Sequence, residues 1–421
     1  MTRYFKSLIA FVIFLILLQS VVISVAGLKR PQWGDEEHFV RTVRLFGEEI
    51  SLNTLKHYNE MSTPLPFVTY ALWGRIFGFE THVLRILSVI IALLTYLLFH
   101  RFLFLLFQEP KIAFLTAVFL AVHPYMVGFS IFVFTDMLPI LFLIVACIAV
   151  VKRKAVVFAL AAAGTLLCRQ HFVFLPVAAG SFYLLSFLGN GKETHPKGWG
   201  TRRMLLASIL SLAPLGLLFL IWQGFSPDNE MRKSYLVEGF YFHPSYLTLY
   251  VCLLFVYLIP IVAVRWRRIY GDSRILIGSF IISWLYWLFP VGPSNYAIAI
   301  DVHTVGLFHR LLQWIWPGGF FEQAVFYAAF LLGLPLLFFL VKDCYQRVKR
   351  RNFDLPLLLD MLILAFLVIL PFSYMCWEKY FLPVVPLAAV RMLLIGNDEQ
   401  GWPVSKSDHT TTAWRNEGLV G

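Results

Sequence analysis

Carboxylates, guanidinium groups and histidines recur in this sequence at the ends of long apolar runs. Ionisable groups at membrane depth are costly to place and therefore indicate a functional site. With the spans predicted below, all of these segments lie on the outer face of a membrane, which predicts one polar cavity open to that side. The segments are Asp35-Glu36-Glu37-His38, Thr135-Asp136, Arg169-Gln170-His171, Ser294-Asn295 followed by Asp301, His303, His309 and Arg310, and Trp377-Glu378-Lys379-Tyr380.

These residue types suit the transfer of a sugar from a lipid-phosphate donor to a hydroxyl group. The acceptor hydroxyl needs a carboxylate within hydrogen-bond reach to take its proton. The departing lipid phosphate needs no strong acid, but it needs cations, and arginine can bind two phosphate oxygens at once. Cations held in place beforehand stabilise the negative charge that develops on the phosphate.

Each of these side chains also has a purely structural interpretation. Asp35 would then belong to a solvated loop, Asp136 would cap the helix that follows it, and Arg169 would be an interfacial anchor. His303 and His309 are six residues apart and do not share a helical face, which argues against a metal pair. A divalent cation between Asp35 and Asp136 is conceivable, because carboxylates suit Mg²⁺ and Mn²⁺. We do not favour it, since a lipid-phosphate donor has only one phosphate to bridge, and we expect no cofactor.

The composition identifies an integral membrane protein. Of 421 residues, 59% are hydrophobic and 14% are charged, against about 45–50% and 25% in a typical soluble chain. The net charge of +11 does not indicate a nucleic-acid partner, because the basic residues form short clusters between apolar runs, as in cytoplasmic loops. The five cysteines form no CxxC pair and are interpreted as packing residues. The basic clusters fall at 152–154, 202–203, 265–268 and 347–351.

We predict an all-α, polytopic membrane domain of about twelve spans over residues 1–396 and a polar cytoplasmic tail over 397–421. Twelve spans place both termini in the cytoplasm, together with every basic cluster. The first run has the alternative of a cleaved signal peptide, although it is long for one. An outer loop should carry a short amphipathic helix over 35–47 and a surface-lying helix over 64–77. The spans are predicted at 8–27, 82–100, 112–130, 132–151, 155–167, 172–188, 204–224, 246–264, 274–291, 321–341, 356–374 and 380–396.

The order of these motifs resembles the multi-spanning glycosyltransferases that use polyprenyl-phosphate sugars. It is most similar to the dolichyl-phosphate-glucose-dependent alpha-1,2-glucosyltransferase family, over roughly residues 30–390. The segment 34–38 resembles the family's Asp-Glu-x-x-His motif, with its histidine one position early. Further segments that resemble family motifs in the same order are Ser62-Thr63-Pro64-Leu65-Pro66, Leu84-Arg85-Ile86-Leu87-Ser88, His123-Pro124-Tyr125 with Phe132-Val133-Phe134-Thr135-Asp136, Cys168-Arg169-Gln170-His171, and Gly292-Pro293-Ser294-Asn295 with His303 downstream.

The resemblance implies a role for each candidate residue. Asp35 would be the catalytic base with Glu36 beside it, and attack opposite the departing phosphate would invert the anomeric centre. The donor and its phosphate would be bound by Asp136, Arg169, Gln170, His171, Arg310 and Lys379. The substrate-binding residues would be His38, Ser294, Asn295, His303 and Glu378. The chain departs from the family at 375–380 and just before Ser294, where an Asp-Lys pair is missing; both departures concern the sugar and the acceptor.

The sequence therefore predicts an inverting hexosyltransferase, with glucose as the favoured sugar. Its partners would be a polyprenyl-phosphate or dolichyl-phosphate sugar, a lipid-linked or membrane-surface acceptor, and membrane lipids. The alternative from another class is a membrane transporter or a flippase for lipid-linked sugars. A prokaryotic plasma membrane is favoured over an endoplasmic reticulum membrane, because the chain has no N-x-Ser/Thr sequon and no basic retention tail.

Overall fold

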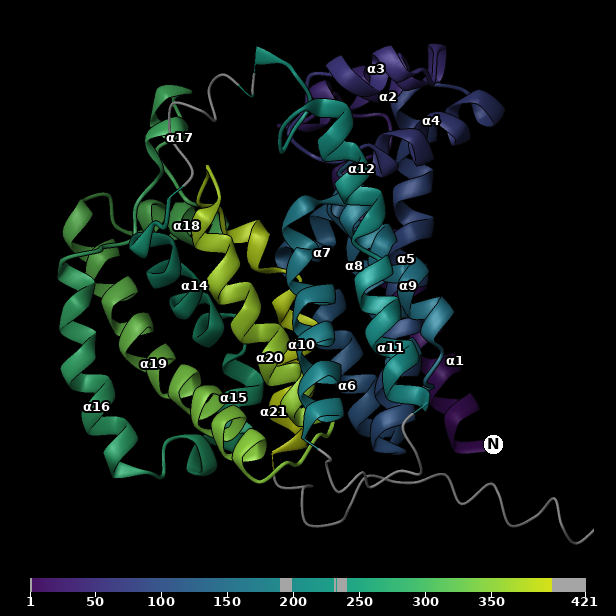
Figure 1. Cartoon of the computed structure of the whole chain (residues 1–421). Helices are drawn as coiled ribbons and strands as arrows, with labels where there is room; N and C mark the ends of the chain where they lie inside the picture. Colours follow the sequence, from purple (N-terminus) through teal and green to yellow (C-terminus); the bar gives the residue numbers. More distant parts are fainter. Residues whose placement is uncertain (1, 190–198, 231, 233–240, 396–421) are drawn as a thin grey trace, which may run out of the picture.

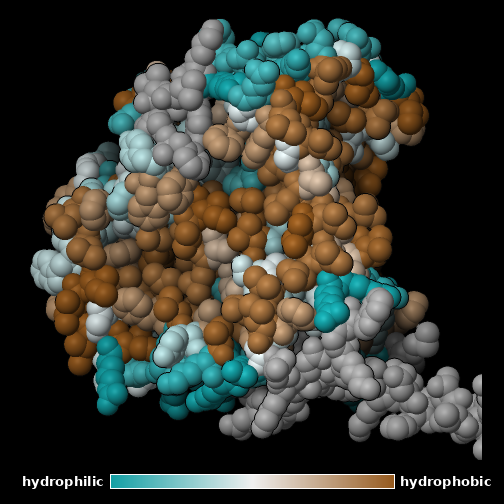
Figure 2. Space-filling view, viewed as in Figure 1, coloured by the Kyte–Doolittle hydropathy of each residue, from teal (hydrophilic) through white to brown (hydrophobic). Residues whose placement is uncertain are grey.

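The computed structural model describes residues 2–189, 199–230, 232 and 241–395, and all regular secondary structure within these segments is helical (Figure 1). The predicted all-α class is thus confirmed. The predicted tail, 397–421, lies outside the described residues. Figure 2 shows apolar side chains over the middle of one face and hydrophilic side chains at both ends, as expected for a protein that crosses a bilayer.

Six described helical segments are long and apolar enough to cross a membrane, or seven if the bent pair α14 and α15 counts as one span. The predicted number of twelve complete spans is not confirmed, although every predicted span falls on an apolar helix. The remaining apolar helices have 10–17 residues each, so they are shorter than the roughly 20 residues that a bilayer requires. The long segments are α1 (Thr2–Ala26), α5 (Thr81–Phe107), η1 with α10 (Gln170–Val173 and Phe174–Leu188), α11 with α12 (Trp199–Leu210 and Ala213–Trp222), α19 (Gly319–Lys349) and α20 with η3 (Leu355–Ile369 and Leu370–Phe372).

The shorter helices complete the bundle. The two helices of the bent pair meet at 91°, a change of direction that the apolar pattern of the sequence did not reveal. The bounds are α6 (Pro110–Ala121), α7 (Pro124–Phe129), α8 (Met137–Val151), α9 (Ala155–Cys168), α14 (Pro244–Val256), α15 (Ile259–Ile269), α16 (Ser273–Ser283), η2 (Trp284–Trp287), α17 (Asn295–Ala299), α18 (Leu307–Ile315), η4 (Glu378–Phe381) and α21 (Val384–Leu394).

The loop after the first span forms three small helices, α2 (Glu36–Glu48), α3 (Leu52–His57) and α4 (Leu65–Phe77). The two helices predicted in this loop are therefore confirmed. In α2 the buried apolar side chains lie on one face, while Glu37 and Arg41 are exposed on the other, because an amphipathic helix buries a single stripe. Figure 1 shows these helices gathered at one end of the molecule, with the N-terminus at the opposite end; we refer to the first as the α2–α4 end.

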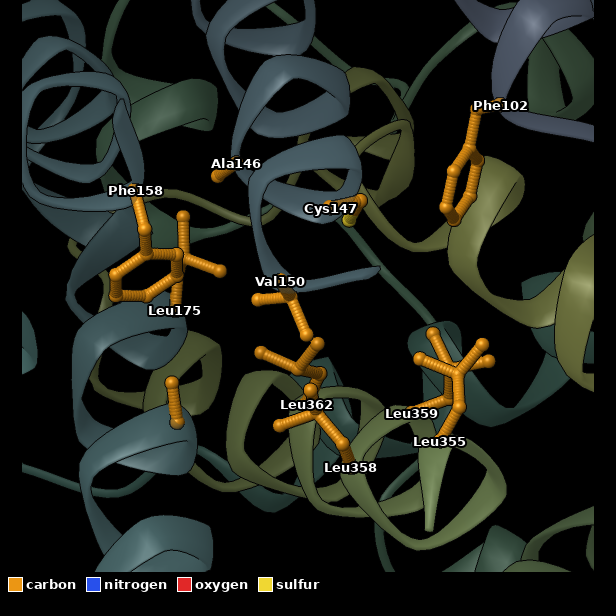
Figure 3. A pocket seen from close by; sticks show the side chains of 11 residues that line it. Phe102, Ala146, Cys147, Val150, Phe158, Leu175, Leu355, Leu358, Leu359 and Leu362 are labelled. Carbon is orange, nitrogen blue, oxygen red and sulfur yellow. The ribbon is translucent and has the colours of Figure 1, made fainter. Parts of the chain in front are cut away.

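Small residues let helices approach closely in the bundle, as is common in membranes. A Cβ added at Gly333 of α19 would lie 2.1 Å from the carbonyl oxygen of Val251 in α14. At Gly164 of α9 it would lie 3.0 Å from the ring of Phe142 in α8. A small internal cavity between α5, α8, α9, α10 and α20 is lined by apolar side chains (Figure 3). Apart from the Cys147 thiol, its lining is hydrocarbon and contains no carboxylate, histidine or basic side chain.

Candidate active site

A lysine and an aspartate 344 residues apart meet at the α2–α4 end. Nζ of Lys379, in η4, donates a hydrogen bond to Oδ2 of Asp35 at 2.6 Å. The Asp35 side chain is 46% exposed and that of Lys379 is 11% exposed. The carboxylate is therefore accessible, while the lysine side chain is largely buried. The rings of Phe134, Trp377 and Tyr380 lie about the ammonium at 5.9, 5.9 and 6.0 Å, within the range of cation–π attraction.

His38, in the first turn of α2, lies beside Asp35 and contacts a second carboxylate. Its Nδ1 lies 2.7 Å from Oε1 of buried Glu60, and its Nε2 lies 3.8 Å from Oδ1 of Asp35. Thr42 donates a second hydrogen bond to the same Glu60 oxygen at 3.3 Å. A doubly protonated imidazole can therefore donate to Glu60 and attract Asp35 with its opposite edge. We refer to Asp35, His38, Glu60 and Lys379 as the carboxylate–ammonium cluster.

Opposing effects set the charges in this cluster. Partial burial would raise the pKa of Asp35, but Lys379 and His38 outweigh it and hold that pKa well below its usual range. Partial burial would likewise lower the pKa of His38, but hydrogen bonds and attraction from Asp35 and Glu60 raise it to about 9. The resting cluster thus holds an ionised Asp35 between two cations, because a nearby opposite charge favours the charged form of each group.

Glu36, which was predicted to lie beside the base, is buried, and both of its carboxylate oxygens accept hydrogen bonds. Its oxygens accept hydrogen bonds from Arg85 Nε at 2.9 Å and Arg85 Nη2 at 2.5 Å, and from the backbone N–H of Val133 at 3.0 Å. Arg85 also donates to the carbonyl oxygens of residues 27, 28, 30 and 31. Glu36 is 0% exposed and its contacts hold the loop next to Asp35 in place; its predicted catalytic role stays a prediction.

Arg169 and Asp136 form a second charged pair near Lys379. Nη2 of Arg169 lies 2.9 and 3.0 Å from the two carboxylate oxygens of Asp136. Asp136 stands at the N-cap position of α8, but its side chain caps no backbone N–H there, so the capping interpretation does not describe it. Arg169 also interacts electrostatically with Tyr380, the residue after Lys379, and this places the pair beside the carboxylate–ammonium cluster.

Three polar atoms close to these residues are buried without a hydrogen-bond partner in the described part of the chain. They are Nε of Arg169, Oγ1 of Thr135 and Oγ of Ser62. An unpaired buried polar group costs about 1–3 kcal/mol, and such groups commonly complete their hydrogen bonds with a ligand or water. Because all three atoms are buried, a bound substrate would pair with them only after a local rearrangement.

The neighbours of Arg169 hold the site together. Nε2 of Gln170 donates to the carbonyl oxygens of Met61 at 2.6 Å and Phe225 at 3.2 Å, which ties η1 to two loops. The half-buried His171 ring lies 5.7 Å from the ring of Tyr380, measured between centroids. Gln170 and His171, two of the predicted donor-binding residues, are thus held in place beside Arg169.

Glu378 is completely buried and accepts four hydrogen bonds. They come from the hydroxyl groups of Tyr125 at 3.2 Å and Tyr257 at 3.1 Å, and from the backbone N–H groups of Phe308 at 2.8 Å and His309 at 2.9 Å. Burial raises its pKa, against these four donors, which lower it. The carboxylate caps the start of α18, so its geometry supports a positioning role for the segment that contains Lys379.

Gly306, just before α18, is required by this close packing. Its φ of +150° lies in the region that favours glycine, and a Cβ there would lie 2.4 Å from the Tyr125 hydroxyl oxygen and 2.5 Å from the Glu378 carboxyl carbon. Any larger residue would both strain the backbone and displace the Glu378 carboxylate.

The remaining predicted residues lie on the 294–310 segment. The Ser294 hydroxyl accepts a hydrogen bond from Ala297 N–H and caps α17, while Asn295 is exposed as its first residue. The exposed His303 pairs with Asp301 at 2.9 Å. Nε of Arg310 donates to Oγ1 of Thr304 at 3.1 Å. The structure brings none of these side chains into contact with Asp35.

Sequence reasoning did not assign roles to Glu60, Arg85 or Tyr125, yet these residues hold the site in place. The signal for Arg85 was a basic residue within an apolar span, inside the 84–88 motif. Within the described residues, no group of three or more His, Cys, Asp or Glu side chains could hold a metal ion. Asp35 contacts Lys379, and Asp136 contacts Arg169.

Residues 62–209 match the model of the DIE2/ALG10 family. Over this range, the resemblance to dolichyl-phosphate-glucose-dependent glucosyltransferases is confirmed. The matched range contains Asp136 and Arg169, whereas Asp35 and Lys379 lie outside it.

The chain is also similar to a solved structure, the crystal structure of ArnT from Cupriavidus metallidurans in the apo state. The TM-score is 0.39 at 14% identity, covering 92% of this chain and 79% of that chain. No curated protein sequence matches the chain significantly. The family match and the apolar helices support a multi-pass membrane glycosyltransferase that uses a polyprenyl-phosphate sugar.

Proposed function

We propose that the protein is an inverting glycosyltransferase that moves a hexose, with glucose favoured, from a polyprenyl-phosphate or dolichyl-phosphate sugar to a hydroxyl group. The acceptor is lipid-linked or otherwise associated with the membrane, and the reaction takes place on the outer or lumenal face, which we assign to the α2–α4 end. The observation that carries this proposal is the 2.6 Å contact between Asp35 and Lys379, which joins an accessible base to a cation suited to a phosphate.

The reaction requires one proton transfer and one displacement. Asp35 accepts the proton of the acceptor hydroxyl group as its oxygen forms a bond to the anomeric carbon. The bond between that carbon and the phosphate oxygen breaks, and its electron pair leaves with the lipid phosphate. General-base catalysis of this kind contributes about 10²–10⁴-fold to a rate. Attack from the face opposite the phosphate inverts the anomeric configuration.

Lys379 links donor binding to the strength of the base. In the resting protein it lowers the pKa of Asp35, which keeps the carboxylate ionised but weakens it as a proton acceptor. A donor phosphate at Lys379 draws the ammonium away from Asp35, and the basicity of Asp35 then increases. The unpartnered Nε of Arg169 is buried in the resting protein; once donor binding opens access to it, it becomes a second donor for the phosphate oxygens, and two cations then stabilise the negative charge on the leaving group.

The direct test is sugar transfer by purified protein in detergent. A panel of radiolabelled polyprenyl-phosphate hexoses would be offered with a membrane lipid extract as acceptor. We expect transfer from one donor, with glucose the first choice, and a product of inverted anomeric configuration. No transfer from any donor by folded protein with a competent extract would contradict the proposal. Flux of a labelled lipid-linked sugar across proteoliposomes would then support the transporter or flippase alternative.

A further inference from the structure

A basic pocket lies where the first two long spans emerge at the α2–α4 end. Its lining consists of residues 28–32, directly after α1, and Thr81 and His82, which open α5. The membrane-crossing segments end at Ala26 and begin at Thr81. Chain connectivity therefore fixes the depth of the pocket: it lies at the edge of the hydrocarbon layer, at the level of lipid head groups.

The charge of this pocket is unusual for its position. Lys29 and Arg30 are exposed, and within the described segments neither forms an ion pair. Basic residues next to a span concentrate on the cytoplasmic side, where Arg3 and Lys6 at the start of the same helix would lie. A second basic pair at the opposite end of the span needs a separate explanation, and an anionic partner supplies one.

Hydrogen bonds from the buried Arg85 side chain fix the backbone of the loop that lines the pocket. The guanidinium of Arg85 donates hydrogen bonds to the carbonyl oxygens of Gly27 at 3.2 Å, Leu28 at 2.9 Å, Arg30 at 2.9 Å and Pro31 at 3.2 Å. The loop therefore wraps around a buried cation. Nε2 of Gln32 also donates to the Thr81 hydroxyl oxygen at 2.8 Å, which joins the two sides of the pocket. A site ordered in advance loses little conformational entropy when it binds a ligand.

We infer that this pocket binds the phosphate of an anionic phospholipid from the surrounding leaflet. Lys29 and Arg30 neutralise the phosphate, and His82 lies beside them as a further nitrogen ligand. The exposed apolar side chain of Val25, 66% exposed on the last turn of α1, offers a surface to the acyl chain just below. The same loop continues to Asp35, and Arg85 holds both the loop and Glu36. A bound lipid thus stabilises the segment that presents Asp35, whichever substrate the protein uses.

The test counts lipids bound to the purified full-length protein by native mass spectrometry. The protein would be titrated with phosphatidylglycerol or with phosphatidylcholine. We expect the wild-type protein to retain phosphatidylglycerol preferentially. The double variant Lys29→Gln/Arg30→Gln should bind it about 10- to 30-fold more weakly, because each basic residue near a membrane surface contributes about 1 kcal/mol. The matched control is Lys152→Gln/Arg153→Gln, which removes two exposed charges from the short connection between α8 and α9.

Three results would overturn this assignment. Equal retention of phosphatidylglycerol by the wild type and by the 29/30 variant would show that the pocket does not hold the lipid. An equal loss in the 152/153 control would show an effect of overall charge. Displacement of the lipid by millimolar inorganic phosphate, with the phosphate itself retained, would identify a site for free phosphate. A Lys29→Arg/Arg30→Lys variant, which keeps both charges, should retain the lipid and so excludes misfolding as the cause.

Discussion

Nη2 of Arg169 contacts both carboxylate oxygens of Asp136, at 2.9 and 3.0 Å, although Asp136 occupies a helix N-cap position where its side chain would ordinarily bind backbone N–H groups. The carboxylate is therefore used to balance a buried guanidinium and not to cap α8. This pairing leaves Nε of Arg169 without a partner among the described residues. The arrangement holds one arginine in place while its buried Nε–H donor remains unpaired.

Replacing Asp136 by Asn should destabilise the protein by about 3 kcal/mol, because the substitution leaves a buried guanidinium without its counter-charge. Thermal unfolding in detergent measures this effect. The control is Glu37→Gln, which breaks the exposed 3.2 Å ion pair between Glu37 and Arg41 and should cost less than about 1 kcal/mol. Equal melting temperatures for the two variants would contradict a buried pair.

The raised pKa of His38, about 9 against an ordinary 6.5, predicts a pH-dependent contribution to stability. The folded protein holds this proton more tightly than the unfolded chain does. The stabilisation is therefore complete below pH 6.5 and is lost as the pH rises through about 9. Melting temperatures of the wild type and His38→Asn should differ most at pH 6 and converge toward pH 10. A difference that stays constant over this range would argue against a protonated His38 between Asp35 and Glu60.

Lys379→Met should both weaken donor binding and change the acid side of the pH–rate profile. Without the ammonium, the pKa of Asp35 rises toward its usual range, so protonation of the base should reduce the rate at a higher pH than in the wild type. The KM for the donor should rise by tenfold or more, since a phosphate contact is lost. Lys379→Arg keeps the charge and should show the smaller change of both quantities. An unchanged acid limb in Lys379→Met would contradict the coupling between the two residues.

Glu378→Gln should destabilise the protein by about 1–3 kcal/mol, because an amide cannot accept all four hydrogen bonds that the buried carboxylate accepts. Sugar transfer should fall as well, since η4 also carries Lys379. Tyr257→Phe removes only one of the four donors and serves as the milder comparison, at about 1 kcal/mol. If the Glu378→Gln variant had the same melting temperature as the wild type, the carboxylate would not be the cap of α18.

Local helices were predictable because their apolar periodicity is a local property. The sequence placed helices over 35–47, 64–77 and 155–167, and the structure has them at Glu36–Glu48, Leu65–Phe77 and Ala155–Cys168. The 91° bend between α14 and α15 was missed, because one continuous apolar run crosses the break at 257–258; Pro260, in the first turn of α15, was the local signal for it. Hydropathy gives the presence of an apolar helix more readily than its direction.

In the candidate site, too, residue types were predictable from the sequence, whereas contacts between distant residues were not. Asp35 and Lys379 were identified by residue type and by resemblance, yet nothing local to either one reveals a contact across 344 residues. Glu36 illustrates the limit most clearly. Sequence alone could not separate it from Asp35, and only the buried Arg85 partner shows that the two adjacent carboxylates have different environments.

The most direct measurement compares sugar transfer by Asp35→Asn with that by Glu37→Gln, two neutralised carboxylates in the same short segment. With Asp35 as the base, the first variant should lose about 10²–10⁴-fold in rate while remaining folded at the assay temperature, which its melting curve checks. The second should transfer sugar at the wild-type rate, because the Glu37 side chain is 69% exposed and pairs only with Arg41 on the surface of α2 within the described residues. Wild-type transfer by Asp35→Asn would contradict the role of Asp35 as the base.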